Sequence, residues 1–210
     1  MRVRPVAPAR LVEELAERVA AVSVQRRGWV RVAVDSAPAG EPDRLAADLV
    51  EALHRRGHPA LHVAAAGFHR PASLRLERGR TNPDAYYEDW LDLGALQREV
   101  VRPLGAGGTG RVLPSLRDPL TDRASRAGYL TLPPGGAVVV SGALLLGAGL
   151  DFDLTVHLAV SAAALGRRTA AELAWTLPAF ARYAEEVRPA ELADVVVRAD
   201  DLRHPAVVEA

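Results

Sequence analysis

The chain has 210 residues, a length that suits one domain with one sizeable core. Its 26 basic residues are all Arg and are balanced by 26 acidic residues, so the formal net charge is zero. This balance gives no support to a polyanionic partner, and we expect neither nucleic-acid nor membrane binding. The absence of Cys excludes disulfides, thiolate catalysis and Cys-ligated metal sites. Because no apolar run reaches the roughly 20 residues of a membrane span, we expect a soluble, cytoplasmic protein.

Apolar periodicity predicts alternating helices and strands in the first part of the chain. The stretch from Leu11 to Val24 has apolar residues at helical spacing, which predicts an amphipathic helix. The β-branched run from Trp29 to Val34, which ends at Asp35, predicts a buried strand. Pro42 suits the first turn of a second helix, which we expect to end at Gly57.

Four further apolar segments predict the remaining strands. They begin at Leu61 (LHVAA), Gly136 (GAVVVSGALLL), Phe152 (FDLTVHLAV) and Leu192 (LADVVVRA). Because these segments lack polar alternation and helical stretches separate them, they indicate a parallel sheet with helices on both faces. Ligands of such sheets bind beyond the carboxyl ends of the strands. The stretch RVAVDSAPAGEPDRL, from Arg31, lies at one of those ends and has the outline of a phosphate-binding loop.

A second glycine-rich motif has the wrong surroundings for a nucleotide site. GAGGTG, residues 105–110, matches G-x-G-x-x-G. A dinucleotide-binding motif needs a strand before it and a helix after it. This one follows the helix-like LGALQREVVRPL and precedes RVLPSL, which is not helical. We therefore expect a flexible loop there.

Six sequence blocks occur in a characteristic order along the chain. They are AGFHRP from Ala66, RGRTNPDAYYED from Arg78, RPLGAGG from Arg102, DPLTD from Asp118, LPPGGAVVVSGALLL from Leu132 and EVRPAELADVVV from Glu186. In this order they resemble the actinobacterial branch of the uridine kinase-like P-loop family, which transfers the ATP γ-phosphate to a nucleoside or a similar small hydroxyl substrate. The resemblance implies a three-layer α/β fold with a five-stranded parallel sheet. It also implies one domain over residues 1–210, with a helical extension at 1–28 and a shortened, arginine-bearing lid at about 161–187.

The phosphate loop departs from the pattern of that family. In G-x-x-x-x-G-K-[ST], the glycines let backbone N–H groups wrap the phosphates, the Lys reaches the β and γ phosphates and the hydroxyl holds Mg²⁺. Aligned without gaps, the eight positions are SAPAGEPD, with Ser36 and Glu41 at the glycines, Pro42 at the Lys and Asp43 at the hydroxyl. A slip of one residue keeps Gly40 as the second glycine but puts Glu41 at the Lys. Neither register contains a lysine, and the carboxylates of Glu41 and Asp43 would repel a phosphate.

Other functional positions of the family are also substituted. Ala66 stands where the family has the acid that takes the proton from the substrate hydroxyl, and Thr81 stands where related kinases grip the ribose. Ser141 replaces the acid of the D-G pair after the third strand. The arginines of the lid that remain as candidate phosphate ligands are Arg167, Arg168 and Arg182.

Two residues are candidates for surviving catalytic groups. His69 lies at the carboxyl end of a predicted strand, where it could contact substrate or serve as an acid/base group, or could be a loop histidine with local hydrogen bonds. Asp118 matches a family position beside the acceptor, although DPLTD is also good turn chemistry and favours a turn role for Asp122. We expect no metal site, because Gly57 interrupts the histidines at 54, 58 and 62.

Four residues are candidates for substrate binding. They are Arg70, Arg80, Tyr86 and Tyr87. The two tyrosines could stack on a base, but aromatic residues at the start of a helix more often belong to the core. Arg80 precedes the altered ribose-binding position, whereas a solvated charged face is the simpler reading of the surrounding charges.

These substitutions favour a pseudoenzyme with a degenerate phosphate loop. The leading hypothesis is a uridine kinase-like protein that lacks ATP-dependent phosphotransfer and keeps a pocket for a small molecule, such as a nucleoside, or a partner. It needs no cofactor. The alternatives are an enzyme recruited to ATP-independent chemistry in the former acceptor pocket and a residual kinase that uses ATP and Mg²⁺. Assembly into a homo-oligomer is left open.

Overall fold

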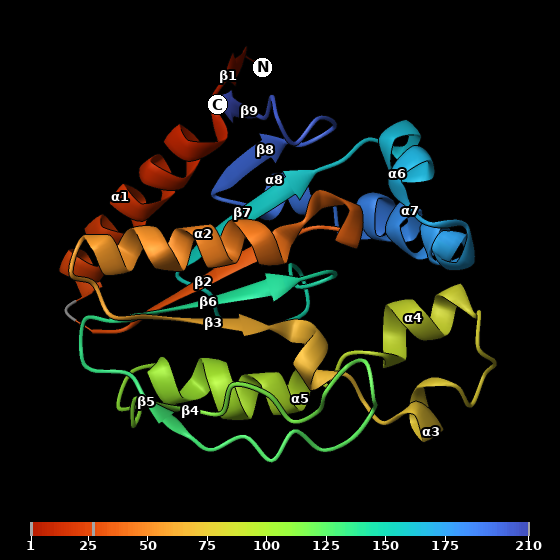
Figure 1. Cartoon of the computed structure of the whole chain (residues 1–210), viewed down its shortest axis with the longest axis horizontal. Coiled ribbons are helices and arrows are strands. Elements are labelled where there is room, and N and C mark those ends of the chain that lie inside the picture. Colours follow the sequence, from red (N-terminus) through yellow and green to blue (C-terminus); the bar gives the residue numbers. More distant parts are fainter. Residues whose placement is uncertain (1, 27, 210) are drawn as a thin grey trace.

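The computed structural model describes residues 2–26 and 28–209. Within these residues the main sheet has seven strands in the order β1-β9-β8-β7-β2-β6-β3 (Figure 1). The strands are β1 (Arg2–Pro5), β2 (Val30–Asp35), β3 (Ala60–Ala64), β6 (Ala137–Gly142), β7 (Leu154–Ala159), β8 (Val195–Arg198) and β9 (Ala206–Glu209). β3, β6, β2, β7 and β8 run parallel, and β9 and β1 extend the sheet in antiparallel pairing.

The predicted α/β fold with five parallel strands is confirmed, but the predicted strand count is two short for the described chain. The additional strands, β1 and β9, are four residues each and pair Arg2 with Glu209. A local sequence pattern does not reveal them, because each strand is short and its partner lies at the other end of the chain. The N-terminal extension, expected to be helical, therefore contains β1 as well as α1 (Pro8–Arg26).

β2 is the middle one of the five parallel strands, and all six of its residues are buried. It pairs with β6 on one side and with β7 on the other, so the backbone of β2 forms hydrogen bonds along both of its edges. Such a strand is covered on both faces and reads as an apolar run without alternation. The charged residues Arg31 and Asp35 are the exceptions in this strand; both are buried, and Asp35 lies at the carboxyl end with no exposure.

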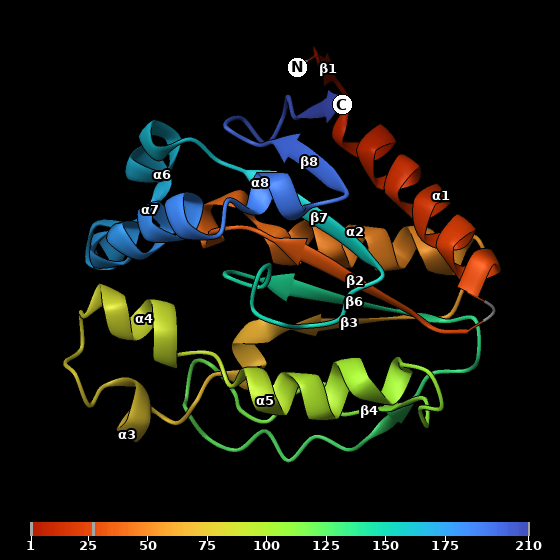
Figure 2. The same ribbon diagram turned by 180° about the vertical axis from the view of Figure 1, so that it is seen from behind.

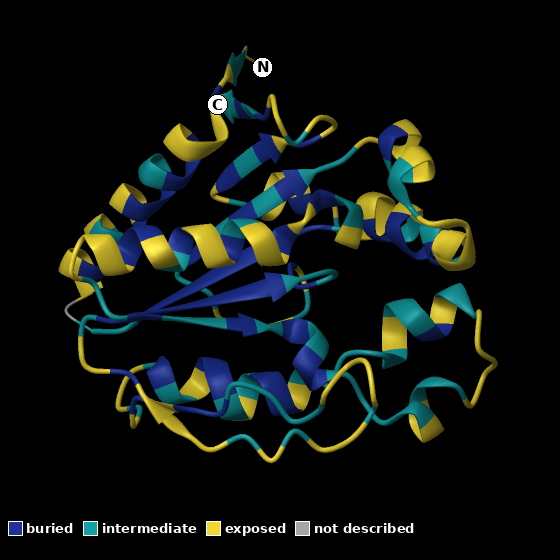
Figure 3. Cartoon of the chain, viewed as in Figure 1, coloured by how far each residue is buried: buried dark blue, intermediate teal, exposed yellow. Residues whose placement is uncertain are grey.

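Helices cover both faces of the sheet (Figures 1 and 2). α1 and α2 (Pro42–Arg55) pack on one face, where Val32 and Val34 join their core. On the other face, α5 (Leu93–Leu96) continues through a π-helical turn and packs with Val138 and Val140. Figure 3 shows the resulting pattern of a buried sheet and helices with exposed outer surfaces.

The remaining elements are short. They are the 3₁₀ turns Pro38–Gly40, Ala65–Phe68, Arg102–Leu104 and Ala171–Thr176, the π-helical turn Gln97–Val101, the helices α3 (Ala72–Arg75), α4 (Pro83–Asp89), α6 (Ala162–Arg168), α7 (Leu177–Glu186) and α8 (Pro189–Leu192), and the strands β4 (Arg111–Val112) and β5 (Leu130–Thr131). The expected lid, residues 161–187, consists of α6, a 3₁₀ turn and α7. None of the described helices combines the length and the apolar character that crossing a membrane requires.

The glycine-rich segment at 105–110 lies between a 3₁₀ turn and β4, so it has neither the strand nor the helix of a dinucleotide site. Its backbone closes a turn: the N–H of Gly110 donates to the Pro103 carbonyl at 2.9 Å, and that of Gly108 donates to the Gly105 carbonyl at 3.0 Å. A side chain at Gly108 would collide with Pro103, because its Cβ would lie 2.1 Å from the Pro103 oxygen. These glycines therefore serve local packing.

Candidate functional site

Residues 36–43 comprise the loop between β2 and α2 and the first two residues of α2, and local contacts fix their backbone. Gly40 approaches Ser36 so closely that a Cβ on it would lie 1.9 Å from the Ser36 Oγ, so glycine is required there. Glu41 has a φ of 54°, in the left-handed region that favours glycine. The gap-free alignment equates Glu41 with the second glycine of the phosphate motif, and its backbone keeps that conformation. Pro42 then begins α2, where a missing N–H costs nothing.

Most backbone N–H groups of this loop are not available to a ligand. Pro38 and Pro42 have no N–H. The N–H groups of Gly40 and Glu41 donate to the carbonyls of Ala37 and Pro38 at 2.8 and 2.9 Å, inside the 3₁₀ turn. A further N–H, that of Ser36, donates to the Gly142 carbonyl at 2.9 Å, and the Ser36 Oγ donates to the Leu158 carbonyl at 2.9 Å. Five of the eight positions from 36 to 43 therefore offer no backbone donor to a ligand.

A carboxylate, a hydroxyl and an imidazole form a hydrogen-bonded chain beside the loop. The Ser141 Oγ donates to the Asp43 Oδ1 at 2.5 Å and lies 2.7 Å from the His62 Nε2. Because the hydroxyl proton goes to Asp43, the Ser141 oxygen accepts from the Nε2–H of His62. Burial lowers the pKa of His62, which keeps the imidazole neutral.

At two positions of this hydrogen-bonded set, 43 and 141, the family resemblance implies other side chains. The resemblance places a hydroxyl at position 43 and an acid at position 141, and here the acid is Asp43 and the hydroxyl is Ser141. Relative to what the resemblance implies, the acid and the hydroxyl thus stand at exchanged positions. Both residues stand out in the sequence, but neither their contact with each other nor the hydrogen bond to His62 could be predicted from it. The proximity of His62 to Ser141 follows from the sheet register, in which His62 pairs with Val139, two residues before Ser141.

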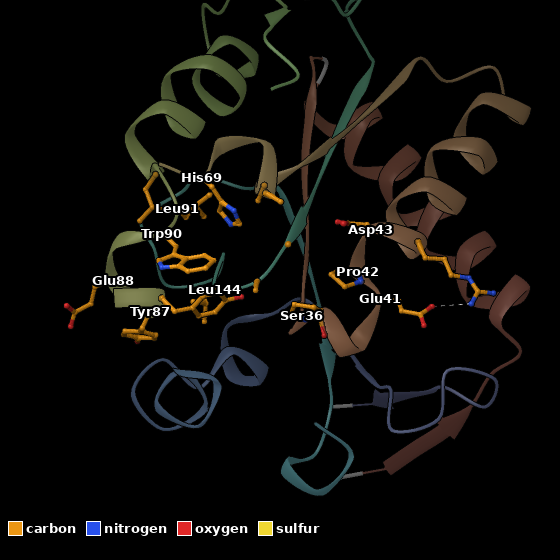
Figure 4. A pocket seen from close by; sticks show the side chains of 18 residues that line it. Ser36, Glu41, Pro42, Asp43, His69, Tyr87, Glu88, Trp90, Leu91 and Leu144 are labelled. Atoms are coloured by element: carbon orange, nitrogen blue, oxygen red, sulfur yellow. Dashed lines mark hydrogen bonds and ion pairs between the residues drawn. The ribbon is translucent and has the colours of Figure 1, made fainter. Parts of the chain in front are cut away.

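A pocket of about 490 Å³ lies at the carboxyl ends of the strands; we call it the loop pocket (Figure 4). One wall is the loop that joins β2 to α2, with Glu41, Pro42 and Asp43, and the opposite wall is formed by residues that follow β3 and by α4. Its lining residues include Ser36, Ala66, His69, Tyr86, Tyr87, Glu88, Trp90 and Leu144. A volume of several hundred cubic ångströms is typical of small-molecule sites, roughly 300–1,000 Å³.

His69 faces this pocket as a neutral imidazole. Burial, together with the nearby Arg75 cation, lowers its pKa to about 4. Its ring meets the Trp90 ring edge-on, with centroids 5.7 Å apart. His69 is therefore placed in the pocket, as the sequence predicts, and at neutral pH it can give or accept one hydrogen bond without carrying charge.

An aromatic cluster forms the wall around His69. Tyr86 packs against Trp90, Trp175 and Phe180, with ring centroids 4.9, 5.7 and 5.7 Å away. Burial raises the pKa of Tyr86 to about 12, so its hydroxyl stays protonated. Tyr86 thus belongs to an aromatic cluster and also lines the pocket.

Arg182, a lid candidate for phosphate binding, is bound to acidic residues instead. Its guanidinium donates to Glu186 at 2.8 Å and, across to α4, to Glu88 at 2.9 Å. These two hydrogen bonds raise the pKa of Arg182. The guanidinium also lies 4.3 Å from the ring centre of Tyr87, whose hydroxyl donates to Glu186 at 3.2 Å. α7 is therefore fastened to α4 beside the pocket.

Asp118, predicted as a catalytic candidate, lies in a turn. Its carboxylate accepts from the backbone N–H of Leu120 at 2.8 Å and of Thr121 at 3.3 Å. These backbone hydrogen bonds lower its pKa. Asp122 also has a structural role, because it accepts from the N–H of Ala72 at 2.9 Å. Among the described residues, Asp118 is not one of those that line the loop pocket.

The other arginine candidates also lie apart from the lining of the loop pocket, as far as the chain is described. Arg168 donates to the Ala199 carbonyl at 2.8 Å, and Arg167 lies in the last turn of α6. Arg70 is 3.8 Å from Asp89, and Arg80 is exposed in the turn before α4. Residues 2–26 and 28–209 contain no group of three or more metal-binding side chains that could hold an ion.

Comparisons with known proteins establish the fold. One solved structure that matches is described as a possible uridine kinase from Bacillus stearothermophilus; it is 19% identical, with a TM-score of 0.65, over 87% of this chain and 98% of that one. A fructose transport system kinase candidate from Silicibacter sp. TM1040 is 24% identical, with a TM-score of 0.60, over 87% of this chain and 94% of that one. This chain has the α/β fold of P-loop kinases. No protein-family model matches it, and no curated protein does.

With this P-loop kinase fold, the loop at 36–43 occupies the position between the central strand and the following helix at which such folds bind phosphate. The loop pocket opens beside it, at the carboxyl ends of the parallel strands, where open α/β sheets bind ligands. The fold thus explains the place of the pocket, and the side chains in it determine what it can hold.

Proposed function

We propose that this chain is a degenerate uridine kinase-like protein that lacks ATP-dependent phosphotransfer and binds a small molecule in the loop pocket. The observation that carries the proposal is the loop itself. Of its eight positions, five offer no backbone donor, and no lysine exists anywhere in the chain to replace them. A phosphate cradle depends on both kinds of donor.

The charges of the loop oppose a triphosphate as well. Glu41 and Asp43 both line the loop pocket. Two like unit charges about 4 Å apart repel by roughly 4 kcal/mol at an effective dielectric near 20. The Asp43 carboxylate is already engaged by Ser141 at 2.5 Å. ATP with Mg²⁺ therefore does not fit these residues.

A residual kinase would need arginines in place of the lysine, and two of the three lid arginines are engaged elsewhere. Arg182 is held by Glu88 and Glu186, and Arg168 is held by the Ala199 carbonyl. Arg44, one position beyond the loop, pairs with Glu41 at 3.2 Å. These contacts favour the binding hypothesis over phosphotransfer.

The pocket suits a neutral molecule with a ring, as a nucleoside has. Tyr86 and Trp90 offer aromatic surfaces, and His69 offers an uncharged hydrogen-bonding group beside them. ATP-independent chemistry would require His69 as a base. A base with a pKa of about 4 is poorly matched to neutral pH, which favours binding over catalysis.

Calorimetry and thermal shift with ATP·Mg²⁺ and with a panel of nucleosides test this proposal. The unmodified protein should show saturable binding of a nucleoside and no binding of ATP·Mg²⁺. The variant with Pro42→Lys, Asp43→Thr and Ala66→Asp serves as the restored reference for ATP binding. Micromolar binding of ATP by the unmodified protein would overturn the proposal.

Two tryptophan variants localise the nucleoside. Ala143 lines the loop pocket, so Ala143→Trp should fill it and abolish nucleoside binding. Ala190→Trp adds the same side chain at an exposed position on α8 and should leave binding unchanged. Equal binding by both variants would contradict the assignment to the loop pocket.

A further inference from the structure

A second cavity, of about 550 Å³, lies between β7 and the lid elements α6 and α7; we call it the lid pocket. Figure 2 shows α6 and α7 beyond the carboxyl end of β7. Most of its lining is apolar, with alanine, leucine and proline side chains and Phe180. In the described chain it shares no lining residue with the loop pocket, so it is a separate site.

His157 and Tyr183 bring polar atoms into this apolar lining. The His157 Nδ1 lies 2.7 Å from the Oδ2 of Asp35, a carboxylate with no solvent exposure. The same oxygen lies 3.2 Å from the Tyr183 hydroxyl, and the Asp35 Oδ1 accepts from the Leu145 N–H at 2.9 Å. Three donors thus hold the Asp35 carboxylate in one orientation.

This network fixes which ring nitrogen of His157 faces Asp35 and donates to it. An ionised carboxylate only accepts, so the Nδ1 of His157 carries the proton that Asp35 accepts. In the neutral ring the Nε2 is then an acceptor. Within residues 2–26 and 28–209, Nε2 has no hydrogen-bond partner, and the His157 side chain is 12% exposed in the wall of the lid pocket. An apolar side chain would be enough to fill this wall of the cavity. The oriented acceptor therefore serves to recognise a hydrogen-bond donor on a ligand.

Tyr183 does not compete for the Nε2. Its hydroxyl accepts from the Leu146 N–H at 2.9 Å and has the Leu146 carbonyl at 3.1 Å and Asp35 at 3.2 Å as acceptors. Burial, followed by the charge of Asp35, raises the pKa of Tyr183, so the hydroxyl remains neutral. The polar group that the lid pocket offers to a ligand is therefore the Nε2 of His157.

We propose that the lid pocket binds a small, mostly apolar molecule whose single hydroxyl donates to the Nε2 of His157. The apolar lining accommodates the body of the ligand, and the volume lies in the range of small-molecule sites. No arginine lines the cavity among the described residues, so nothing there balances a carboxylate. A neutral alcohol or phenol matches the one acceptor that the network leaves free.

Calorimetry and fluorescence with 2-naphthol test the proposal, with naphthalene as the probe that lacks the hydroxyl and 2-naphthoate as the charged probe. We expect saturable 1:1 binding of 2-naphthol, at least tenfold tighter than that of either control probe. Ala184 lines the lid pocket and is exposed, so Ala184→Trp should abolish binding, whereas Ala190→Trp, on an exposed position outside the lining, should not.

His157→Phe supplies the test of the acceptor. It keeps an aromatic ring in the wall, so 2-naphthol should lose its advantage over naphthalene, and the two should bind within about twofold of each other. Failure of this variant to fold leaves the probe pairs and Ala184→Trp as tests. Absence of 2-naphthol binding, equal binding of naphthalene by the unmodified protein, or binding unaffected by Ala184→Trp would overturn the proposal.

Discussion

At the scale of single residues, His69 should make stability depend on pH. Burial lowers its pKa to about 4 in the folded protein, whereas an unfolded histidine has a pKa of about 6.5. Between these values the unfolded chain binds more protons, so this contribution to stability is complete above pH 6.5 and is lost as the pH falls towards 4. The largest effect is on the order of 3 kcal/mol. Urea unfolding at pH 4.5 and pH 7 measures it.

The variant His69→Gln isolates this contribution. Its free energy of unfolding should fall less between pH 7 and pH 4.5 than that of the unmodified protein, because the carboxylates that titrate in this range are common to both. His62, whose pKa burial also lowers, remains in both and adds the same background. An NMR titration that places the pKa of His69 near 6.5 in the folded protein would contradict the prediction.

Individual side-chain contacts of the site could not be predicted from the sequence. The substitutions at positions 41–43 are visible in the sequence because a motif with fixed spacing defines what should stand there. The hydrogen bond between Asp43 and Ser141 joins residues 98 positions apart, and no local pattern predicts it. Asp118 matches a family position, and its own sequence, DPLTD, also predicts the turn in which the structure places it.

At the scale of elements, the attachment of α7 to α4 should control how often the lid opens. Arg182 bridges the two helices through Glu88 while it also bonds to Glu186 on its own helix. Arg182→Gln removes the bridge. We expect amide exchange in α4 and α7 to become roughly two- to fivefold faster, with little change in the melting temperature, because exposed ion pairs add little to global stability. Exchange mass spectrometry measures the change.

Arg188, just beyond the end of α7, provides a matched control. Arg188 pairs with Glu191 at 3.2 Å, and both side chains are exposed, but this pair does not reach α4. Arg188→Gln should therefore leave exchange in α4 unchanged. Equal exchange in α4 for Arg182→Gln and the unmodified protein would show that the aromatic cluster around Tyr86, rather than the ion pairs, holds the lid.

At the scale of the whole molecule, the parallel core was predictable and its edge was not. Apolar residues dominate the five parallel strands, and β2, whose six residues are all buried, has the clearest signature. The edge strands β1 and β9 have no such signature, because only their mutual pairing, Arg2 with Glu209 and Pro5 with Ala206, defines them. The lid pocket escaped prediction for a similar reason, since Asp35 and His157 are 122 positions apart.

The pairing of β1 with β9 at the edge of the sheet should contribute to stability and limit self-association. Deleting residues 2–5 removes β1, breaks the bonds from Arg4 to Glu14 and Glu209, and leaves β9 as an unpaired edge. We expect the melting temperature to fall by roughly 5 °C, since each kcal/mol corresponds to about 2–4 °C for a chain of this size. The free edge should also promote self-association, which light scattering detects. The variant with Arg2→Gln and Arg4→Gln keeps the strand and should remain monodisperse; equal association by both variants would assign the effect to lost charge rather than to the exposed edge.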